Sequence, residues 1–366
     1  MGASVLKIAL VGCGMIADQH VAQIRRIAGC ALVGVCDNEP LMAQQLADRF
    51  HVPHSFSDVS EMLRSVKPQV VHITTPAQSH FPLGKLCLEA GCHVYIEKPF
   101  TVTAAQAEEL LDLAEVKGLN VTAGHNLQFN PEAIRMRELV KQGFLGGPPV
   151  HLDCVQCFGH DDPTYGKALL GDQTHWIRSL PGSLLHNLIS HGVAKVAEFL
   201  PSGQPTVIAK AFSSPYLTGI GQTDIVDELR AIICDGPNTT ASFTFSTQFG
   251  AGSNHLCLYG KKASLIADST NRMLIPVRQT GYKSYLRFFL APRAYAAEYR
   301  RNSWRNIWQF IRKDFHMDYG MKKLIESFYR SVEGTAAVPI PYREILTTAR
   351  IMDGIFSQIV KNPPTT

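Results

Sequence analysis

Near its start the chain has a short apolar run that leads directly into the glycine motif Gly12-Cys13-Gly14-Met15-Ile16-Ala17. In such a motif Gly12 allows a tight turn, Gly14 lets the backbone approach a pyrophosphate, and Ala17 lets the next helix pack close to the strand. The phosphates would meet the free N–H groups of Met15 and Ile16 at the helix N-terminus, where the helix dipole favours an anion. The motif alone is a weak signal, but its place between a strand and a helix predicts a dinucleotide-binding turn.

The glycine motif belongs to an alternation of apolar runs and helix-like segments that fills the first third of the chain. The runs have the length and continuous apolar character of strands that are buried on both faces. Such an alternation predicts a parallel sheet that is covered by helices on both faces. The predicted strands are 6–11, 31–36, 70–74, 93–96 and 120–123, and the predicted helices are 15–28, 39–50, 82–90 and 103–117.

An acidic residue, Asp37, follows the second predicted strand. At this place in a dinucleotide-binding domain a carboxylate, with Asn38 beside it, can accept hydrogen bonds from the ribose hydroxyls of the adenosine. The same carboxylate would repel a 2′-phosphate, so the sequence favours NAD over NADP. The alternative is a structural role, in which Asp37 caps a turn with Asn38.

The strand predicted at 93–96 ends in Glu97-Lys98-Pro99. Because the carboxyl ends of strands in an open parallel sheet face the ligand crevice, Lys98 is placed to act on a substrate. A partly desolvated lysine can hold a substrate hydroxyl and favour the loss of its proton, and Glu97 could orient that lysine. The alternative is a surface salt bridge between neighbours, which would contribute little to stability.

Together these motifs resemble those of the Gfo/Idh/MocA oxidoreductases, the family of glucose-fructose oxidoreductase and inositol dehydrogenase. The resemblance covers about residues 5–280 and 320–360, and the Glu-Lys-Pro signature is its most specific part. The residues that carry it are Gly12, Gly14, Ala17, Asp37, Thr75, Pro76, His80, Glu97, Lys98, Pro99, Gly124, His125, Asn126, Gly182, Asn187 and His191.

The resemblance implies further contacts to NAD at the same sheet edge. In the family the segment Thr74-Thr75-Pro76 lies along the cofactor with His80 near it, although an ordinary place at a helix N-terminus explains His80 equally well. Gly124-His125-Asn126 resembles the crossover into a second domain. The cofactor residues implied beyond the glycine motif and Asp37 with Asn38 are Thr74, Thr75, Pro76, His80, Glu97, Lys98 and Asn126.

The resemblance places the acid–base group in the second domain. Residues 184–200 are predicted as one helix, with Asn187 and His191 together on one side and apolar residues on the other. Relatives carry Asp-x-x-x-His here, with the His as base and the Asp on the substrate. The ordinary pKa of a histidine, near 6.5, suits His191 to take a hydroxyl proton. Asn187 lacks the family's charge but keeps its hydrogen-bonding capacity, and we expect Lys98, His191 and Asn187 to be the catalytic residues.

A loop rich in Gly and Asp precedes this helix and carries Tyr165, His175, Trp176 and Arg178. This mixture suits a polar, hydroxyl-rich ligand, with an aromatic ring to stack on a sugar. We therefore expect these residues to bind substrate together with Lys98, Asn187 and His191. The alternative for each of them is an ordinary surface loop.

Alternating runs follow at 206–213, 227–234, 239–247, 255–259 and 263–267, and they predict an antiparallel sheet. Relatives use this sheet for substrate binding and for dimer or tetramer contact. The predicted architecture is α/β, with a Rossmann parallel sheet in residues 1–125 and a C-terminal α+β domain in 126–341 that holds a large, mostly antiparallel open sheet. A helix at about 342–363 is expected to pack back on the first domain.

Composition excludes several other classes of protein. The chain of 366 residues is 45% hydrophobic, which is too apolar for a disordered protein. Neither an apolar run long enough to cross a membrane nor a signal peptide is predicted. The nine cysteines lie mostly in apolar runs, which indicates reduced thiols and a cytoplasmic location. Cys154 and Cys157 lie on a predicted strand and face opposite ways, so no metal site is expected.

One aromatic segment departs from the family pattern. Residues 281–315 hold eight basic and two acidic residues, a net charge of +6, so the rest of the chain carries −2 of the overall +4. A basic aromatic helix could lie on an anionic membrane surface or meet a lipid-linked or phosphorylated sugar. We favour instead a helical insertion at about 281–318 that packs against the sheet or another subunit, with its arginines solvated.

These features predict an NAD-dependent dehydrogenase that acts on a CH–OH group of a sugar, sugar derivative or cyclic polyol. Two alternatives remain open. One is an enzyme that keeps NAD tightly bound and uses transient oxidation for glycosidase-like or epimerase-like chemistry, and the other is a non-catalytic NAD-binding subunit. A homodimer or homotetramer through the C-terminal sheet is expected. The modest net charge does not indicate a nucleic-acid partner.

Overall fold

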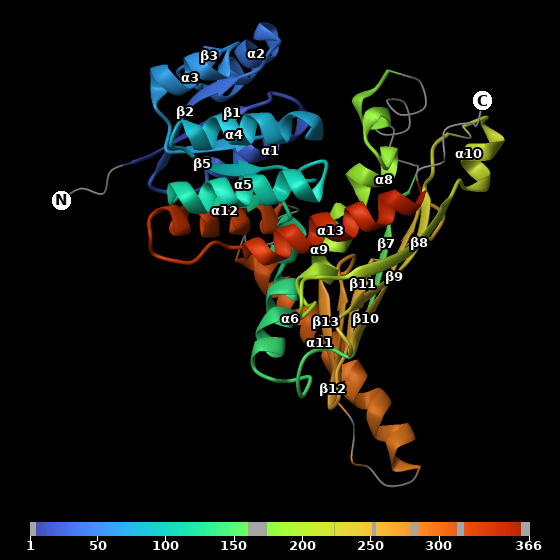
Figure 1. Ribbon diagram of the computed structural model, residues 1–366. Coiled ribbons are helices and arrows are strands. Elements are labelled where there is room, and N and C mark those ends of the chain that lie inside the picture. The colour runs from blue at the N-terminus through green and yellow to red at the C-terminus, as the bar shows by residue number, and fades with distance from the viewer. Residues whose placement is uncertain are drawn as a thin grey trace, which may run out of the picture. The chain divides into compact units, whose positions relative to one another are not determined.

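The computed structural model describes residues 5–159, 174–222, 224–250, 254–278, 281, 285–312 and 318–359. The chain divides into two compact units (Figure 1). The first contains the residues up to Asn126 and Gly320–Ala349, and the second contains Leu127–Tyr319 and the residues from Arg350 onward. The division therefore differs from the predicted one at its C-terminal end. Residues 320–341 join the first unit, and the second half of the last helix joins the second.

The described residues of the first unit form a six-stranded sheet in the order β3-β2-β1-β4-β5-β6. Every neighbouring pair is parallel, which confirms the predicted Rossmann fold. The strand order reverses between β1 and β4, and in an open sheet the ligand crevice lies outside the carboxyl ends of the strands at such a point. The strands are β1 (Leu6–Val11), β2 (Cys30–Cys36), β3 (Ser55–Phe56), β4 (Val70–Ile73), β5 (His93–Ile96) and β6 (Val121–Ala123).

Helices alternate with these strands, as the sequence predicts. The helix at 104–117 begins with a side-chain cap, because the Thr103 side chain accepts a hydrogen bond from the Gln106 N–H. Strand β3 and helix α3 were not predicted, although the Asp58 side chain caps α3 by accepting from the Glu61 N–H at 2.7 Å. The helices are α1 (Met15–Ile24), α2 (Pro40–Phe50), α3 (Val59–Val66), η1 (Ala77–Ser79), α4 (His80–Glu89), α5 (Ala104–Lys117) and α12 (Tyr319–Val332).

The described residues of the second unit form a seven-stranded sheet in the order β13-β12-β11-β7-β10-β9-β8. It is antiparallel except where β7 pairs with β10, as the predicted mostly antiparallel sheet requires. Strand β13 was missed because Pro276 interrupts its apolar pattern, and an edge strand tolerates a proline. The strands are β7 (His151–Cys157), β8 (Thr206–Phe212), β9 (Glu228–Asp235), β10 (Thr239–Ser246), β11 (His255–Tyr259), β12 (Ala263–Asp268) and β13 (Met273–Arg278).

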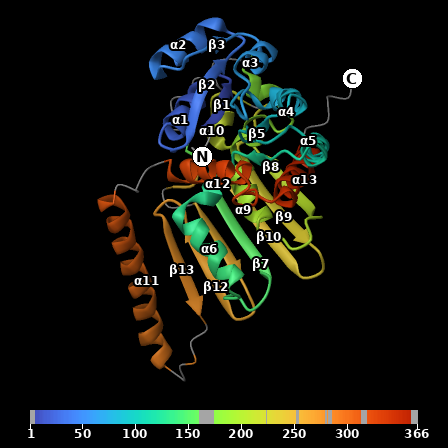
Figure 2. The same ribbon diagram turned by 90° about the vertical axis from the view of Figure 1, so that its left-hand side faces the viewer.

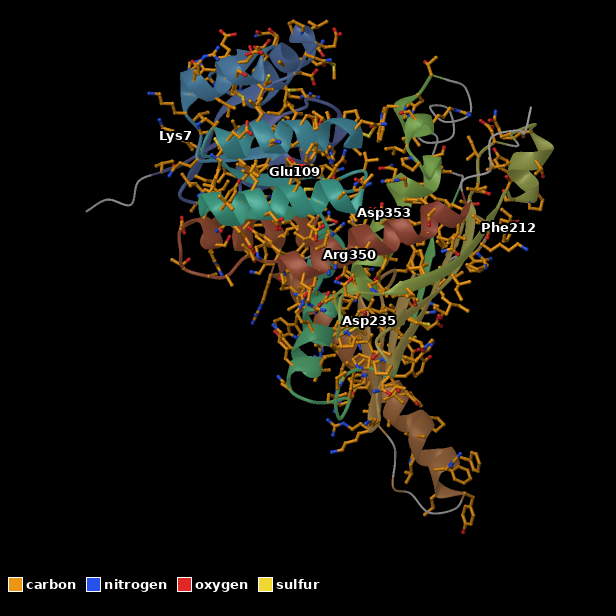
Figure 3. The ribbon with its side chains drawn as sticks, viewed as in Figure 1. Lys7, Glu109, Phe212, Asp235, Arg350 and Asp353 are labelled. Carbon is orange, nitrogen blue, oxygen red and sulfur yellow. The ribbon has the colours of Figure 1, made fainter. Side chains whose placement is uncertain are left out.

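The core of the second unit lies where helices cover one face of this sheet. The apolar face predicted for residues 184–200 is buried there with Phe243 and Phe245 of β10. Arg350 of α13 also ties that helix to the unit by donating to the Gly203 carbonyl at 3.2 Å (Figure 3). The helices are η2 (Asn126–Phe129), α6 (Pro131–Lys141), η3 (Trp176–Ser179), α8 (Ser183–Leu188), α9 (Ser190–Ala197), α10 (Pro215–Gly219), α11 (Leu286–Ile311) and α13 (Tyr342–Ile359).

The single helix predicted over 184–200 is wrong, because the chain forms α8 and α9 with a break at Ile189. The side chain of Gln156, from β7, enters the break. Its amide accepts from the Gly192 N–H at 3.1 Å and donates to the Leu188 carbonyl at 2.9 Å. These are the two groups that a continuous helix would bond to each other, so Gln156 replaces one turn of the helical hydrogen-bond ladder.

Candidate functional site

The glycine motif forms the turn between β1 and α1. Gly12 has φ +95°, and a Cβ there would lie 2.7 Å from Thr75 Cγ2 and 2.8 Å from backbone atoms of Thr74 and Thr75. The Thr74 hydroxyl donates to the Gly12 carbonyl at 2.6 Å and so holds the end of β4 against the turn. Gly12 is therefore required by both its backbone conformation and this close approach.

Gly14 faces open space, since a Cβ there would meet no described atom within 4 Å. It is the N-cap residue of α1, and no side chain in the described part of the chain caps this helix end. Met15 is 72% exposed, while Ala17 is fully buried against the sheet. The turn thus leaves room above the first N–H groups of α1, and these residues fit the pyrophosphate of a dinucleotide.

The carboxylate of Asp37 is fixed at the edge of this turn. One oxygen accepts from the Cys13 N–H at 2.7 Å and the other accepts from the Glu39 N–H at 3.0 Å. Burial, helped by the charge of Asp37, raises the pKa of the Cys13 thiol to about 12 and so keeps it protonated. Each carboxylate oxygen keeps further lone pairs, so Asp37 can also accept from ribose hydroxyls. Asn38 is exposed beside it.

His80 joins two segments of the sheet edge. One ring nitrogen lies 2.8 Å from the Thr75 carbonyl, and the other lies 2.8 Å from the carbonyl of Pro99. Burial lowers the pKa of His80 although both carbonyls favour its protonated form. Because both nitrogens face backbone oxygens, His80 holds the Thr75-Pro76 segment to the segment that follows Lys98. Pro76 itself is exposed.

Glu97 and Lys98 follow β5 at the same carboxyl edge of the sheet. Glu97 is buried, and its second carboxylate oxygen accepts from the backbone N–H of Lys98 at 3.0 Å. Lys98 is half-buried, and its peptide bond to Pro99 is cis. Burial opposes ionisation of Glu97, but the hydrogen bond from His20 and the charges of His20 and Lys98 outweigh it, so the pKa of this carboxyl lies below its ordinary value.

Behind Glu97 a buried chain of side chains crosses the unit. Glu97 lies 2.9 Å from His20, the two histidines His20 and His72 lie 2.9 Å apart, and His72 lies 2.9 Å from the Tyr329 hydroxyl. Every pair lies within hydrogen-bonding distance, so the four side chains form one continuous network that ends on the Glu97 carboxylate. The ring of Tyr95 stacks on His72 with centroids 4.7 Å apart. The sequence did not predict this series of hydrogen-bonded side chains, which fixes the Glu97 carboxylate beside the backbone N–H of Lys98.

The strand end after β6 carries His125 and Asn126. His125 is buried, and burial together with the charge of Lys98 lowers its pKa to about 4. Asn126 is half-buried, with its backbone N–H on the Gly124 carbonyl at 2.8 Å. A neutral His125 and a neutral Asn126 therefore complete this part of the edge.

Acid is expected to destabilise the first unit through His125. Between pH 6.5 and pH 4 the unfolded chain binds one more proton at this residue than the folded chain, so stability falls as the pH decreases. This one group should account for about 3 kcal/mol of the loss. Urea unfolding at pH 7 and pH 4 measures it, and His125→Gln should lose about 3 kcal/mol less than the wild type. Equal losses in the two proteins would contradict this assignment.

In the second unit Asn187 and His191 lie on either side of the helix break. Asn187 is the second-to-last residue of α8 and is 5% exposed, whereas His191 lies in the first turn of α9 and is half-buried. The side chain of Gln128, from η2, donates to the Ala194 carbonyl of α9 at 3.2 Å. The break and Gln128 thus set the position of the helix that carries His191.

The loop residues before α8 are only partly described. His175 caps η3 by accepting from the Ile177 N–H, and its ring lies 5.6 Å from that of Trp176. Arg178 is held by Asp224 at 2.8 Å and by Gln222 at 3.0 Å, which gives it a structural role in this loop. Tyr165, the remaining predicted substrate residue, lies outside the described residues.

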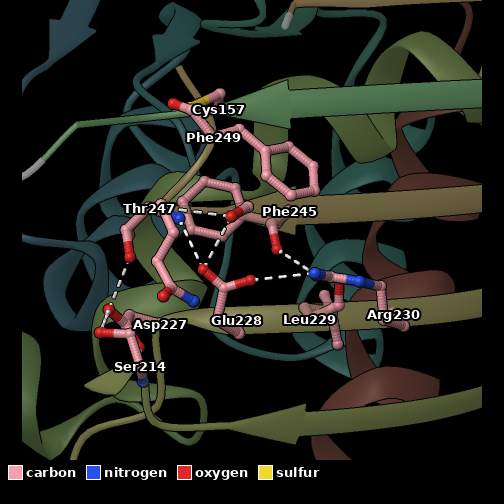
Figure 4. Close-up of polar contacts among 11 residues, drawn as sticks. Cys157, Ser214, Asp227, Glu228, Leu229, Arg230, Phe245, Thr247 and Phe249 are labelled. Carbon is pink, nitrogen blue, oxygen red and sulfur yellow. Dashed lines mark hydrogen bonds and ion pairs between the residues drawn. The ribbon is translucent and has the colours of Figure 1, made fainter. Parts of the chain in front are cut away.

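Two adjacent buried carboxylates at the start of β9, also missed from the sequence, form a dense network (Figure 4). Asp227 accepts from the Ser214 N–H at 2.6 Å and from the Thr247 hydroxyl at 2.6 Å. Glu228 accepts from the Thr247 N–H at 2.9 Å and pairs with Arg230 at 3.0 Å. In the sequence these two acids were assigned only to the start of an alternating strand. Their hydrogen bonds to Ser214 and Thr247 attach neighbouring segments to this end of the sheet.

Other predicted features can be compared with the structure directly. All nine cysteines are free thiols. Within the described residues no group of three His, Cys, Asp or Glu side chains is arranged to hold a metal ion. Among the helices described, none is both long and apolar enough to cross a membrane.

Comparisons with known proteins agree with this geometry. Residues 6–125 match the model of the oxidoreductase family with an NAD-binding Rossmann fold, Gfo/Idh/MocA. The chain is similar to D-glucoside 3-dehydrogenase of Escherichia coli (strain K12), with 35% identity over 147 residues, 40% of this chain and 42% of that protein. It is 30% identical over 206 residues to D-xylose 1-dehydrogenase (NADP+) of Hypocrea jecorina, which is 54% of this chain and 50% of that protein. The chain thus spans half or less of the length of these relatives.

A solved structure extends the likeness over the whole fold. The WlbA dehydrogenase from Bordetella pertussis, in complex with NADH and UDP-GlcNAcA, matches with a TM-score of 0.77 and 15% identity. The match covers 98% of this chain and 96% of that chain. At this identity the likeness shows the fold alone, which is a Rossmann unit followed by an open, mostly antiparallel sheet.

Proposed function

Residues 6–125 of this chain belong to the Gfo/Idh/MocA oxidoreductases with an NAD-binding Rossmann fold, and on that premise we propose that the chain is an NAD-dependent sugar or polyol dehydrogenase. One observation carries the proposal. The carboxyl edge of a single parallel sheet holds an open glycine turn, a fixed carboxylate and a lysine, from Gly14, Asp37 and Lys98. The first two suit a dinucleotide, and the third suits a hydroxyl beside it.

The cofactor would be held by the turn and by the segments fastened to it. The N–H groups of Met15 and Ile16 would receive the pyrophosphate, and Asp37 with Asn38 would receive the ribose hydroxyls. Thr74, Thr75, Pro76, His80, Glu97, Lys98 and Asn126 are proposed to complete this site. His80 would act by holding Thr75 and Pro99 together, since both of its ring nitrogens already face their carbonyls.

When bound, NAD supplies the acceptor for a hydride that leaves a carbon of the substrate. Lys98 would donate a hydrogen bond to the hydroxyl on that carbon and stabilise its negative charge as the proton leaves. His191 would take the hydroxyl proton on a ring nitrogen, and Asn187 would orient the substrate through its amide. In the reverse direction the same groups would return the proton to the carbonyl oxygen.

The substrate class follows from the groups offered to it. Lysine, amide and imidazole side chains bind hydroxyls by hydrogen bonds, and Tyr165, His175 and Trp176 would add aromatic faces for a sugar ring. Arg178 is expected to position this loop through Asp224 and Gln222. D-glucoside and D-xylose dehydrogenases among the relatives support a sugar or polyol substrate. A homodimer or homotetramer through the C-terminal sheet, in the cytoplasm, is part of this proposal.

Replacing Asp37 should change which cofactor binds. Asp37→Ser removes the carboxylate that holds the ribose hydroxyls, so the affinity for NAD is expected to fall about 30-fold. The repulsion of a 2′-phosphate disappears as well, so binding of NADP should strengthen about tenfold. Isothermal titration calorimetry with both cofactors measures these changes.

Two further variants make this test specific. Asp48→Ser removes an exposed acid of α2 that bonds only to Gln44 among the described contacts, and it should leave both affinities unchanged. Asp37→Asn keeps a hydrogen-bond acceptor without the charge, so it should lower the affinity for NAD less than Asp37→Ser does. If the wild type binds NADP as tightly as NAD, Asp37 does not select the cofactor.

A further inference from the structure

Helix α11 lies alongside β13, the edge strand of the second sheet, and its N-terminal end projects past the strand ends (Figures 1 and 2). All 26 of its residues are described, and among them only Asn302 is buried. The predicted insertion that packs on the sheet is therefore present only as a narrow contact. The residues that the structure describes leave most of this long helix uncovered.

Two asparagines of α11 bond to the protein beside it. The amide of Asn302 accepts from the Leu274 N–H at 3.1 Å and donates to the Leu274 carbonyl at 2.9 Å, so it pairs with the free edge of β13. One turn further on, Asn306 donates to the Asn271 carbonyl at 3.1 Å. These hydrogen bonds attach the helix to the edge strand and to the turn before it.

The opposite side of α11 is apolar and exposed. On a helical wheel of 100° per residue, large apolar side chains gather within about 60° of the point opposite Asn302. Trp304 is 62% exposed and Phe289 is 65% exposed. The apolar side comprises Leu286, Phe289, Trp304, Ile307, Trp308 and Ile311. Further exposed aromatic residues lie towards the Asn302 side, so the helix exposes apolar surface around most of its circumference; they are Phe288, Tyr295, Tyr299 and Phe310.

Arginines converge beside this apolar side. A groove of about 700 Å³ is lined by four arginines and two tryptophans, Arg135, Arg300, Arg301, Arg305, Trp304 and Trp308. Burial and the nearby charge of Arg135 lower the pKa of Arg305, although the charge of Glu298 opposes this shift. Glu298, the one acid of α11, pairs with Arg301. The groove therefore has an excess of positive charge that an anion would neutralise.

We propose that α11 docks on an anionic lipid surface, with its apolar side in the headgroup region and the arginines of the groove on lipid phosphates. Tryptophan and arginine on one face of an in-plane helix suit that interface. A second copy of the chain fits less well, because a two-fold contact sets the same patch against itself and would bring the arginines of both copies together. The docking goes beyond the proposed function, and it would hold the chain at a membrane whether or not the enzyme turns over.

Vesicle sedimentation of the full chain tests this docking. The chain should sediment with vesicles of phosphatidylcholine and phosphatidylglycerol at least tenfold more strongly than with phosphatidylcholine alone. Replacing both Arg300 and Arg301 by Ala should weaken this binding about 25-fold, fivefold for each charge. Trp304→Ala with Trp308→Ala should weaken it more than tenfold and remove the blue shift of tryptophan fluorescence on binding, since Trp176 is the remaining tryptophan.

A matched pair of variants controls for loss of apolar surface. Val5→Ala with Val116→Ala removes exposed apolar side chains from the first unit, away from the sheet proposed for subunit contact, and should leave vesicle binding unchanged. NAD binding by each variant shows that it is folded and does not depend on the membrane result. No sedimentation with anionic vesicles at low salt would overturn the proposal. So would a loss of dimer mass in light scattering by the tryptophan variant, which would make a second copy the occupant.

Discussion

Lys98→Met is expected to lower turnover about 10³-fold, far more than it lowers the affinity for NAD, to which Lys98 is only one of several proposed contributors. Methionine keeps most of the volume of the side chain but cannot hold a hydroxyl or stabilise its negative charge, and a positioned acid–base group typically contributes factors of this size. His191→Ala should cause a similar loss, because it removes the group that takes the proton. Steady-state NADH production with a sugar that the wild type oxidises, together with calorimetry for NAD, measures both quantities.

Lys85 provides the matched control for this loss. It lies on α4 of the same unit and pairs with Glu109 of α5 at 2.8 Å on the surface (Figure 3). Lys85→Met removes the same charge and adds the same side chain, yet it should keep normal turnover. If Lys98→Met also kept near-normal turnover, the proposed role of Lys98 would be wrong.

His20→Leu is expected to destabilise the chain by about 3–5 kcal/mol, the cost of leaving a buried ion without its partner. Glu97 is buried and takes its shortest described side-chain contact from His20, at 2.9 Å. The substitution also breaks the link from His20 to His72. Urea unfolding at pH 7, followed by tryptophan fluorescence and circular dichroism, gives the free energy of unfolding.

A double-mutant cycle separates the ion pair from the loss of packing. Glu97→Gln removes the charge, so adding it to His20→Leu should recover part of the lost stability. Lys85→Met, which breaks an exposed ion pair, should leave the free energy of unfolding close to that of the wild type. A loss below about 1 kcal/mol for His20→Leu would show that Glu97 does not depend on this histidine.

Local sequence patterns predicted the Rossmann unit because its signals lie within a few residues of one another. The turn at Gly12 follows a strand and precedes a helix, and Asp37 follows the next strand. Parallel pairing then brings these strand ends to one edge without further information. The predicted fold class is confirmed, whereas the roles of Asp37, Lys98 and His191 stay predictions.

Contacts between distant parts of the chain could not be predicted in the same way. The side chain of Gln156 enters the break at Ile189 from strand β7, and it bonds to Gly192, which lies 36 residues further along the chain. The link between His72 and Tyr329 joins β4 to a helix near the other end of the chain. The sequence around Gln156 and His72 does not indicate these contacts, because sequence alone does not distinguish a buried glutamine or histidine from an exposed one.

The aromatic helix shows a different limit. Composition alone showed a basic aromatic segment, and packing on the sheet was the favoured interpretation. The helix does meet the sheet, and hydrogen bonds of Asn302 and Asn306 attach it there, but most of its large aromatic residues stay exposed. Which side of a helix faces its own protein depends on the neighbouring edge strand, here β13, and β13 was not predicted.

Single-turnover absorbance at 340 nm tests the central claim most directly. The chain would be mixed with NAD and a panel of sugars, polyols and nucleotide sugars, and the NADH formed per chain would be measured. About one NADH per chain is expected with at least one panel member, and Lys98→Met should form NADH from the same compound about 10³-fold more slowly. If panel members bind to the wild type together with NAD but none of them yields NADH, the proposal that the chain is an NAD-dependent dehydrogenase is contradicted.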